Sequence, residues 1–185
     1  MQTLIARLGR LICMGVLVLS SAFSHTAFAE NKHLAVQTRV ELDKYLGLWY
    51  EVARKPIYYQ QVCVKEVTAR YTLNENGNIV VDNRCMDEDG QIKRSLGEAF
   101  VVNPPFNSKL KVSFMPDALR WLPVGRGDYW ILKLDEHYQM VLVGEPHLKY
   151  MWILSREAQP DPTHVQELVR YAKGLGYDVE NLIYN

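Results

Sequence analysis

The 185-residue sequence has no net charge and few of the residue types that most often build catalytic or metal sites. It holds 21 Lys and Arg residues against 21 Asp and Glu residues, so it lacks the basic excess that draws proteins to nucleic acid. Only three cysteines and five histidines are present. No Cys-x-x-Cys pair, Gly-rich phosphate loop or Ser-His-Asp pattern occurs. These absences argue against a nucleic-acid-binding protein and give no support to an enzyme.

The histidines and acidic residues are scattered or clustered in ways that do not suggest chemistry. His33 lies near the N-terminus, His137 and His147 lie in turn-rich segments, and His164 lies on a predicted helix. No two of them share the spacing of a metal-binding pair. The three consecutive carboxylates at 87–89 precede a glycine and are typical of a hydrated turn. We therefore expect no metal, no cofactor and no catalytic residue.

The N-terminus has the pattern of an export signal. Arg7 and Arg10 precede an apolar run over 11–22, and Ala27-Phe28-Ala29 supplies the small residues of a cleavage site. The run falls short of the roughly 20 residues that span a bilayer. We predict a secretory signal peptide over 1–29. Cys13 lacks the context that lipoprotein processing requires, so the chain is not expected to be a typical lipoprotein.

Cleavage would leave a polar leader over 30–39 and a single domain over 40–185. Because residues 1–29 hold two basic residues and no acidic one, the remainder carries a net charge of −2. Its two cysteines, Cys63 and Cys85, would fold in an oxidising compartment, where such a pair usually bridges. A flat strand ladder would hold them too far apart, but the connection over 56–64 can bend back. We expect the disulfide.

From residue 48 onward, short β-type runs alternate with turn residues at the spacing of a sandwich or barrel. Leu110, Val112 and Phe114 share one face of such a run, and Asn76-Gly77 predicts a type I′ hairpin turn. Eight strands close a barrel that can hold one small ligand. The predicted strands cover 48–55, 65–73, 78–84, 91–102, 109–115, 128–134, 139–144 and 149–155.

One segment near the C-terminus reads as a helix. Asp161 is a favourable N-cap, and Pro162 suits the first turn. An apolar stripe follows, and Gly174 or Gly176 ends the pattern. Because only one stripe is apolar, we expect this helix to pack against the outer wall of the barrel. The stripe consists of Val165, Leu168, Val169 and Ala172.

Three motifs occur in an informative order. The first is the run 42–51, which contains Gly47 and Trp49, the second is 134–138, and the third is 152–156, which ends at Arg156. Together they resemble the lipocalin family, in particular its branch of bacterial lipocalins and apolipoprotein D. The resemblance implies an all-β, eight-stranded antiparallel up-and-down barrel with one C-terminal α-helix outside. A guanidinium stacked on the indole would close one end, a structural role for Gly47, Trp49 and Arg156.

Alternation and strand direction then predict a ligand site. The inward-facing positions would be Val112, Phe114, Trp130, Leu132 and Met140. The connections 56–64, 85–90, 115–127 and 145–148 would surround the open mouth. Two of these connections are unusually apolar, which favours a gate, a dimer contact or a membrane contact, unless the loops simply fold back as a lid. The expected rim residues are Ile57, Tyr58, Tyr59, Trp121 and Leu122.

The expected function is to bind, store or transport lipids or other apolar molecules, with fatty acids and lysophospholipids as ligands. The resemblance places this activity in the bacterial cell envelope, in the periplasm or at the outer membrane, for membrane maintenance under stress. Two alternatives stay open. One is a lipocalin-type enzyme, an isomerase or de-epoxidase that acts on a bound lipid through Cys63 or Cys85. The other is an interaction module that uses the rim, for example as a homodimer.

Overall fold

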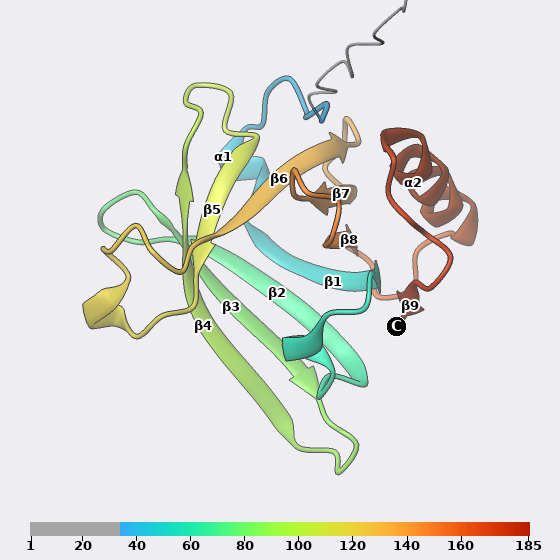
Figure 1. Cartoon of the computed structure of the whole chain (residues 1–185), viewed down its shortest axis with the longest axis horizontal. Coiled ribbons are helices and arrows are strands. Elements are labelled where there is room, and N and C mark those ends of the chain that lie inside the picture. Colours follow the sequence, from blue (N-terminus) through green and yellow to red (C-terminus); the bar gives the residue numbers. More distant parts are fainter. Residues whose placement is uncertain (1–33) are drawn as a thin grey trace, which may run out of the picture. The chain divides into compact units, whose positions relative to one another are not determined.

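A computed structural model describes residues 34–185 (Figure 1). The expected signal peptide and the first part of the leader lie outside the described residues. The elements are α1 (Leu42–Tyr45), β1 (Gly47–Arg54), η1 (Tyr58–Gln60), β2 (Lys65–Leu73), β3 (Ile79–Met86), β4 (Ile92–Val101), β5 (Lys109–Ser113), η2 (Asp117–Leu119), β6 (Gly127–Leu134), β7 (Met140–Gly144), β8 (Met151–Ser155), α2 (Pro162–Leu175) and β9 (Ile183–Tyr184).

Eight antiparallel strands form a closed barrel, as the sequence predicted. Strands β2 to β8 pair with their neighbours in chain order, and β1 pairs with both β8 and β2 to complete the ring. All four connections 55–64, 87–91, 114–126 and 145–150 therefore lie at one end of the barrel, which we call the mouth. The opposite end lies near α1.

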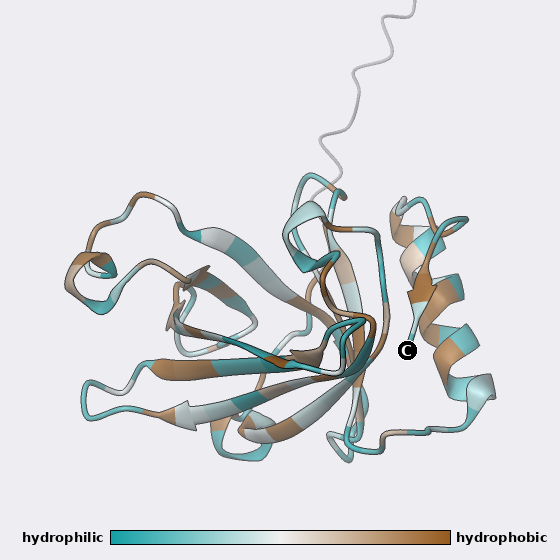
Figure 2. Ribbon diagram, turned by 90° about the horizontal axis from the view of Figure 1, so that it is seen from below, coloured by the Kyte–Doolittle hydropathy of each residue, from teal (hydrophilic) through white to brown (hydrophobic). Residues whose placement is uncertain are grey.

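Hydrophilic and hydrophobic residues alternate along much of the strands, as the colour bands of Figure 2 show. The alternation separates an inner face from an outer face. In β5, Leu110 is buried inside, whereas the Nζ atom of Lys111 pairs with Asp128 on the outside at 2.9 Å. Strand β7 is the exception, because all five of its residues are buried. Its outer face is covered by α2, so it has no polar face.

Helix α2 packs outside the barrel, as expected from its single apolar stripe (Figure 1). The side chain of Asp161 accepts a hydrogen bond of 2.8 Å from the backbone N–H of Thr163. The helix ends at Gly176, whose φ of 104° is a conformation that favours glycine. The predicted stripe is buried against the outer faces of β6, β7 and β8. This cluster is separate from the one inside the barrel.

The β2–β3 hairpin differs from the predicted type I′ turn. Its connection spans residues 74–78, and only Gly77 has a positive φ, of 76°. The Asn74 Oδ1 atom accepts hydrogen bonds from the backbone N–H groups of Asn76 and Asn78, at 3.0 and 2.9 Å. An asparagine side chain can thus organise a longer turn through local hydrogen bonds. The Asn76-Gly77 dipeptide alone did not indicate this longer turn.

The last residues form a short strand that the sequence pattern showed only as an extended tail. In β9, Tyr184 pairs with Ala53 and Ile183 with Arg54, next to β1 where β2 has diverged. The side-chain amide of Asn185 donates to Oε1 of Glu51 at 2.9 Å. The tail therefore covers the exposed edge of β1 near the mouth.

The expected disulfide between Cys63 and Cys85 is present, with the two Cα atoms 5.4 Å apart. The ladder between β2 and β3 is irregular between Lys65 and Thr68, and Glu66 has a φ of 54°. This bend brings the connection 55–64 back toward β3. The bridge therefore fixes the first mouth connection to the barrel wall.

We predict that the double variant Cys63→Ser/Cys85→Ser unfolds with a free energy about 3 kcal/mol below that of the native chain, because the bridge closes a loop with a sequence separation of 22. Urea unfolding followed by circular dichroism measures the difference. Dithiothreitol should lower the stability of the native chain by a similar amount and leave the double variant unchanged. Equal stabilities with and without the bridge would contradict this account.

Candidate functional site

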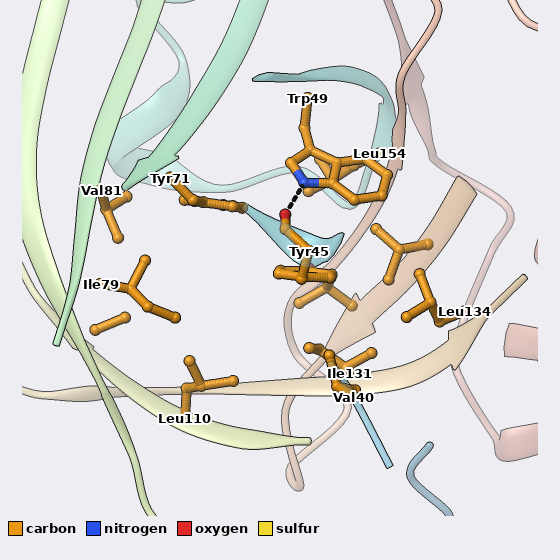
Figure 3. Close-up of a cluster of buried hydrophobic side chains, with 13 residues drawn as sticks. Val40, Tyr45, Trp49, Tyr71, Ile79, Val81, Leu110, Ile131, Leu134 and Leu154 are labelled. Atoms are coloured by element: carbon orange, nitrogen blue, oxygen red, sulfur yellow. Dashed lines mark hydrogen bonds between the residues drawn. The ribbon is translucent and has the colours of Figure 1, made fainter. Parts of the chain in front are cut away.

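The end of the barrel opposite the mouth is closed by a packed cluster of buried side chains, which we call the floor (Figure 3). Trp49 is fully buried there, and its Nε1–H donates to the backbone oxygen of Tyr45 at 2.8 Å. The floor consists of Val40, Tyr45, Trp49, Tyr71, Ile79, Val81, Ala99, Leu110, Ile131, Leu134, Val141, Val143 and Leu154.

Arg156 seals the floor from outside. Its guanidinium carbon lies 3.8 Å from the centre of the Trp49 ring. The same guanidinium donates to the backbone oxygens of five residues, namely Lys44, Tyr45, Leu46, Leu48 and Tyr138. A Cβ atom on Gly47 would lie only 3.2 Å from Nη1 of Arg156, and Gly47 has a φ of 100°. The motif residues Gly47, Trp49 and Arg156 thus form one structural unit.

Above the floor, the inner face of the barrel is not fully buried. Ala69, Val112, Tyr129 and Trp152 pack against the floor but remain partly accessible. Each lies two residues nearer the mouth than a floor residue on the same strand, which is one step along the same face. Because these side chains face inward, their accessible surface borders space inside the barrel. We call this space the upper interior; it is the candidate binding site.

Two glycines shape the upper interior in opposite ways. A Cβ atom on Gly97 would lie 2.8 Å from the ring of Phe114, so the aromatic ring occupies the place of the missing side chain. Gly127 pairs with Val112 on the inner face, and a Cβ atom on Gly127 would have the Val112 oxygen as its nearest neighbour, at 4.0 Å. Space at Gly127 is therefore open.

Three tyrosine hydroxyls meet where the floor borders this space. The Tyr129 oxygen lies 2.7 Å from that of Tyr45 and 3.1 Å from that of Tyr71. The rings of Tyr45 and Tyr71 are stacked, with centroids 5.8 Å apart (Figure 3). Burial raises the pKa of each phenol well above its ordinary value. All three groups therefore keep their protons at neutral pH.

A buried ion pair lies nearer the mouth. Nη1 of Arg54 donates to Oε1 of Glu51 at 2.7 Å, and both side chains are almost fully buried. Gln60 donates to Oε2 of Glu51 at 2.6 Å, and Nη2 of Arg54 reaches the backbone oxygen of Cys63 at 3.2 Å. The pair thus anchors the connection 55–64, which the disulfide also holds. This connection folds over one side of the mouth.

The structure places two of the five predicted lining residues inside the barrel. Val112 packs against the floor, and Phe114 covers Gly97 on the inner face. Leu132 and Met140 instead lie in the cluster under α2, and Trp130 contacts that cluster. These three side chains point outward, contrary to our expectation.

The faces of Trp130 and Leu132 were predicted wrongly because β6 contains a bulge, and that of Met140 because β7 has no polar face. Ile131 pairs with Val143 and Lys133 pairs with Leu142, so Leu132 is an extra residue on its strand. Lys133 and Leu132 therefore both lie on the outer side, where Nζ of Lys133 lies 4.6 Å from the centre of the Tyr171 ring. Using Lys133 to set the alternation consequently inverted the faces of the residues before it.

The predicted rim residues divide between exposed and buried positions. Tyr58, Tyr59 and Trp121 are 87%, 66% and 72% exposed, which is unusual for large aromatic side chains. Leu122 is partly buried, and Ile57 is only 2% exposed, so Ile57 belongs to the interior of its connection and not to the rim surface. The exposed rim is therefore aromatic.

Sequence reasoning missed Ala69, Tyr129 and Trp152. Trp152 could have been found by counting back from Leu154, because alternate residues of β8 share a face. Tyr129 was assigned to the wrong face by the bulge. Ala69 carries no sequence signal, since a small residue marks this site by the space that it leaves.

The profile of the lipocalin-like domain matches residues 40–185, nearly all of the described chain. The chain belongs to the lipocalin family. Temperature-induced lipocalin-1 of Arabidopsis thaliana is 38% identical to it over 155 residues, covering 83% of this chain and 82% of the relative. The outer membrane lipoprotein Blc of Vibrio cholerae is 35% identical, covering 78% and 81%. Apolipoprotein D of Mus musculus is 33% identical, covering 85% of each chain.

Solved structures agree on the fold. Insecticyanin from the tobacco hornworm Manduca sexta superposes with a TM-score of 0.62 at 18% identity, covering 82% of this lipocalin and 83% of that chain. Apocrustacyanin C2 gives a TM-score of 0.60, also at 18% identity, with 78% of each chain covered. At this identity the likeness establishes the barrel and its outer helix.

Membership of the lipocalin family supports the binding of small hydrophobic molecules. Within residues 34–185, no helix is long and apolar enough to cross a membrane. In the same part of the chain, no group of three or more His, Cys, Asp or Glu side chains is placed to hold a metal ion.

We predict that Arg156→Lys lowers the free energy of unfolding by about 2–4 kcal/mol, because lysine cannot stack on Trp49 and reach five carbonyl oxygens together. Urea unfolding measures the loss. The matched control is Arg170→Lys on the exposed face of α2, which should change stability by no more than about 0.5 kcal/mol. Similar effects of the two substitutions would refute the structural role of Arg156.

We also predict that Leu132→Ala lowers the free energy of unfolding by about 2–4 kcal/mol, because it opens a cavity in the cluster under α2. Affinity for an apolar dye such as N-phenyl-1-naphthylamine should stay unchanged, since Leu132 faces away from the upper interior. The dissociation constant comes from a fluorescence titration. If the variant kept native stability but bound the dye more weakly, the result would contradict this account and indicate that Leu132 faces the upper interior.

Proposed function

We propose that this lipocalin carries one elongated apolar molecule, such as a fatty acid or a lysophospholipid, in its upper interior. The observation that carries the proposal is the accessible inner surface of Ala69, Val112, Tyr129 and Trp152 above a packed floor. Each methylene group that leaves water for this space contributes about 0.8 kcal/mol. An alkyl tail of moderate length would therefore bind without any strong polar contact.

The inner face also offers two polar groups to a ligand, one on β1 and one on β3. Nε of Arg54 and Oδ1 of Asn83 are buried and have no hydrogen-bond partner among residues 34–185. The first is a donor and the second is an acceptor. Buried polar groups are usually satisfied, so these two atoms favour a ligand that carries a polar group. Arg54 lies at the mouth end of β1, whereas Asn83 pairs with Ala69 above the floor.

We further propose that the protein acts in the bacterial cell envelope, in the periplasm or at the outer membrane, where it serves membrane maintenance. Support comes from the export pattern over 1–29 and from the similarity to Blc of Vibrio cholerae, which is named as an outer membrane lipoprotein. Because Cys13 lacks the lipoprotein context, this chain would meet membranes through its folded surface and not through a lipid anchor.

The exposed aromatic side chains Tyr58, Tyr59 and Trp121 support contact of the rim with a lipid surface. The same surface would serve a homodimer, which is the alternative use of the rim. Either contact would place the mouth next to the source or the recipient of the ligand.

The enzymatic alternative required a free thiol at Cys63 or Cys85. The two residues form a disulfide, so the oxidised protein has no thiolate at either position. The Tyr45, Tyr71 and Tyr129 phenols stay protonated at neutral pH, because burial raises the pKa of each. We therefore favour binding over catalysis.

The direct test is to place a larger side chain in the upper interior. Ala69→Phe should weaken binding of N-phenyl-1-naphthylamine at least about tenfold, because the new ring occupies the space above Tyr71. Palmitic acid and lysophosphatidylcholine should displace the dye from the native chain with one site per molecule. Fluorescence titration gives both dissociation constants.

The matched control is Thr72→Phe, on the outer face of the same strand, which should bind the dye like the native chain. Circular dichroism checks that both variants are folded. The proposal fails if the native chain does not bind the dye or either lipid, or if the dye binds equally well when Ala69 is replaced by phenylalanine.

A further inference from the structure

The hydroxyls of Tyr45, Tyr71 and Tyr129 carry one more proton than the hydrogen bonds between them use. Each phenol carries one proton to donate. Tyr129 forms one hydrogen bond with Tyr45 and a second with Tyr71. Two bonds use two protons, whichever oxygen donates in each. One hydroxyl proton is therefore always free to donate to another group.

Small residues leave room for that other group. Gly127 lies two residues nearer the mouth than Tyr129 on β6, and the space at its Cβ position is open. Ala69 lies two residues nearer the mouth than Tyr71 on β2 and is partly accessible. Tyr129 is itself partly accessible. The cluster therefore borders the inner end of the upper interior.

The charges near the cluster disfavour an anion. The Glu51 carboxylate lies on the inner face near Tyr71. Its charge is balanced by Arg54, whose Nη1 lies 2.7 Å from Oε1 of Glu51. A second carboxylate would be desolvated here, and Glu51 would repel it. The charge of Arg156 also acts on Tyr45 and Tyr71, but its guanidinium already donates to five backbone oxygens. A neutral oxygen acceptor meets neither penalty.

We infer that the Tyr45–Tyr71–Tyr129 cluster is a recognition site for a neutral hydrogen-bond acceptor, such as a ketone or ester carbonyl, at the inner end of the bound molecule. This inference rests on the proposed carrier function and refines it. An unmodified alkyl tail would leave the free hydroxyl proton without a partner, whereas a carbonyl oxygen would accept it. The preferred ligand is therefore an apolar molecule with an oxygen on the end that enters first.

The test compares two probes of the same shape, 2-tridecanone and 2-methyl-1-tridecene, in which a C=CH₂ group replaces C=O. Each competes with N-phenyl-1-naphthylamine for the native chain. We expect the ketone to bind about five- to tenfold more tightly, the gain of one hydrogen bond in a site shielded from water. In the triple variant Tyr45→Phe/Tyr71→Phe/Tyr129→Phe the two probes should bind equally.

The triple variant removes all three hydroxyls together, so it leaves no buried hydroxyl without a partner. Its matched control is Tyr171→Phe/Tyr184→Phe; Tyr171 contacts the cluster under α2, Tyr184 lies on β9, and the preference for the ketone should persist. A second measurement needs only the native chain. The infrared stretch of carbonyl-¹³C 2-tridecanone should lie at lower frequency when bound than in hexane, because the carbonyl accepts a hydrogen bond.

The outcomes separate the two proposals. Equal affinities of the native chain for both probes, with the carbonyl stretch unshifted, would overturn the tyrosine site and leave the carrier function standing. A ketone preference that survives in the triple variant would also overturn it, because the donor would lie elsewhere. Failure of the native chain to bind the dye and both probes would overturn the carrier function and the tyrosine site together.

Discussion

The stack of Arg156 on Trp49 is the contact on which the rest of the structure depends. The guanidinium ties the end of β8 to the segment from α1 to β1, and these parts of the chain lie more than 100 residues apart in sequence. By sealing one end, it lets the floor pack to the density of a protein core. A barrel closed at one end can then keep inner-face side chains accessible above the floor without losing its shape.

The upper interior results from where side chains are small as much as from where they are apolar. Phe114 fills the place that Gly97 leaves, whereas nothing fills the place left by Gly127. The disulfide and the Glu51–Arg54 pair hold the first mouth connection, so the boundary of this space is fixed by covalent and ionic contacts. In the function that we propose, the apolar part of the inner face provides affinity, and the tyrosine cluster at the inner end provides a point of selectivity.

The sequence was sufficient for the barrel, the outer helix, the disulfide and the closing motif, because each has a local pattern or a distinctive residue pair. It was insufficient for the faces of β6 and β7. The extra residue Leu132 reverses the alternation that the position of Lys133 predicted, and β7 has no polar residue to mark its outer side. Bulges and doubly buried strands depend on tertiary packing, which a period-two pattern does not contain.

The central claim is that the upper interior of the folded chain holds a single apolar molecule. Native mass spectrometry of the protein purified from its own host tests this claim most directly. The account predicts a species heavier than the bare chain by the mass of one small apolar molecule, which organic extraction then releases for identification. A bare chain that also fails to gain such a mass after incubation with lipid extract of the same host would contradict it.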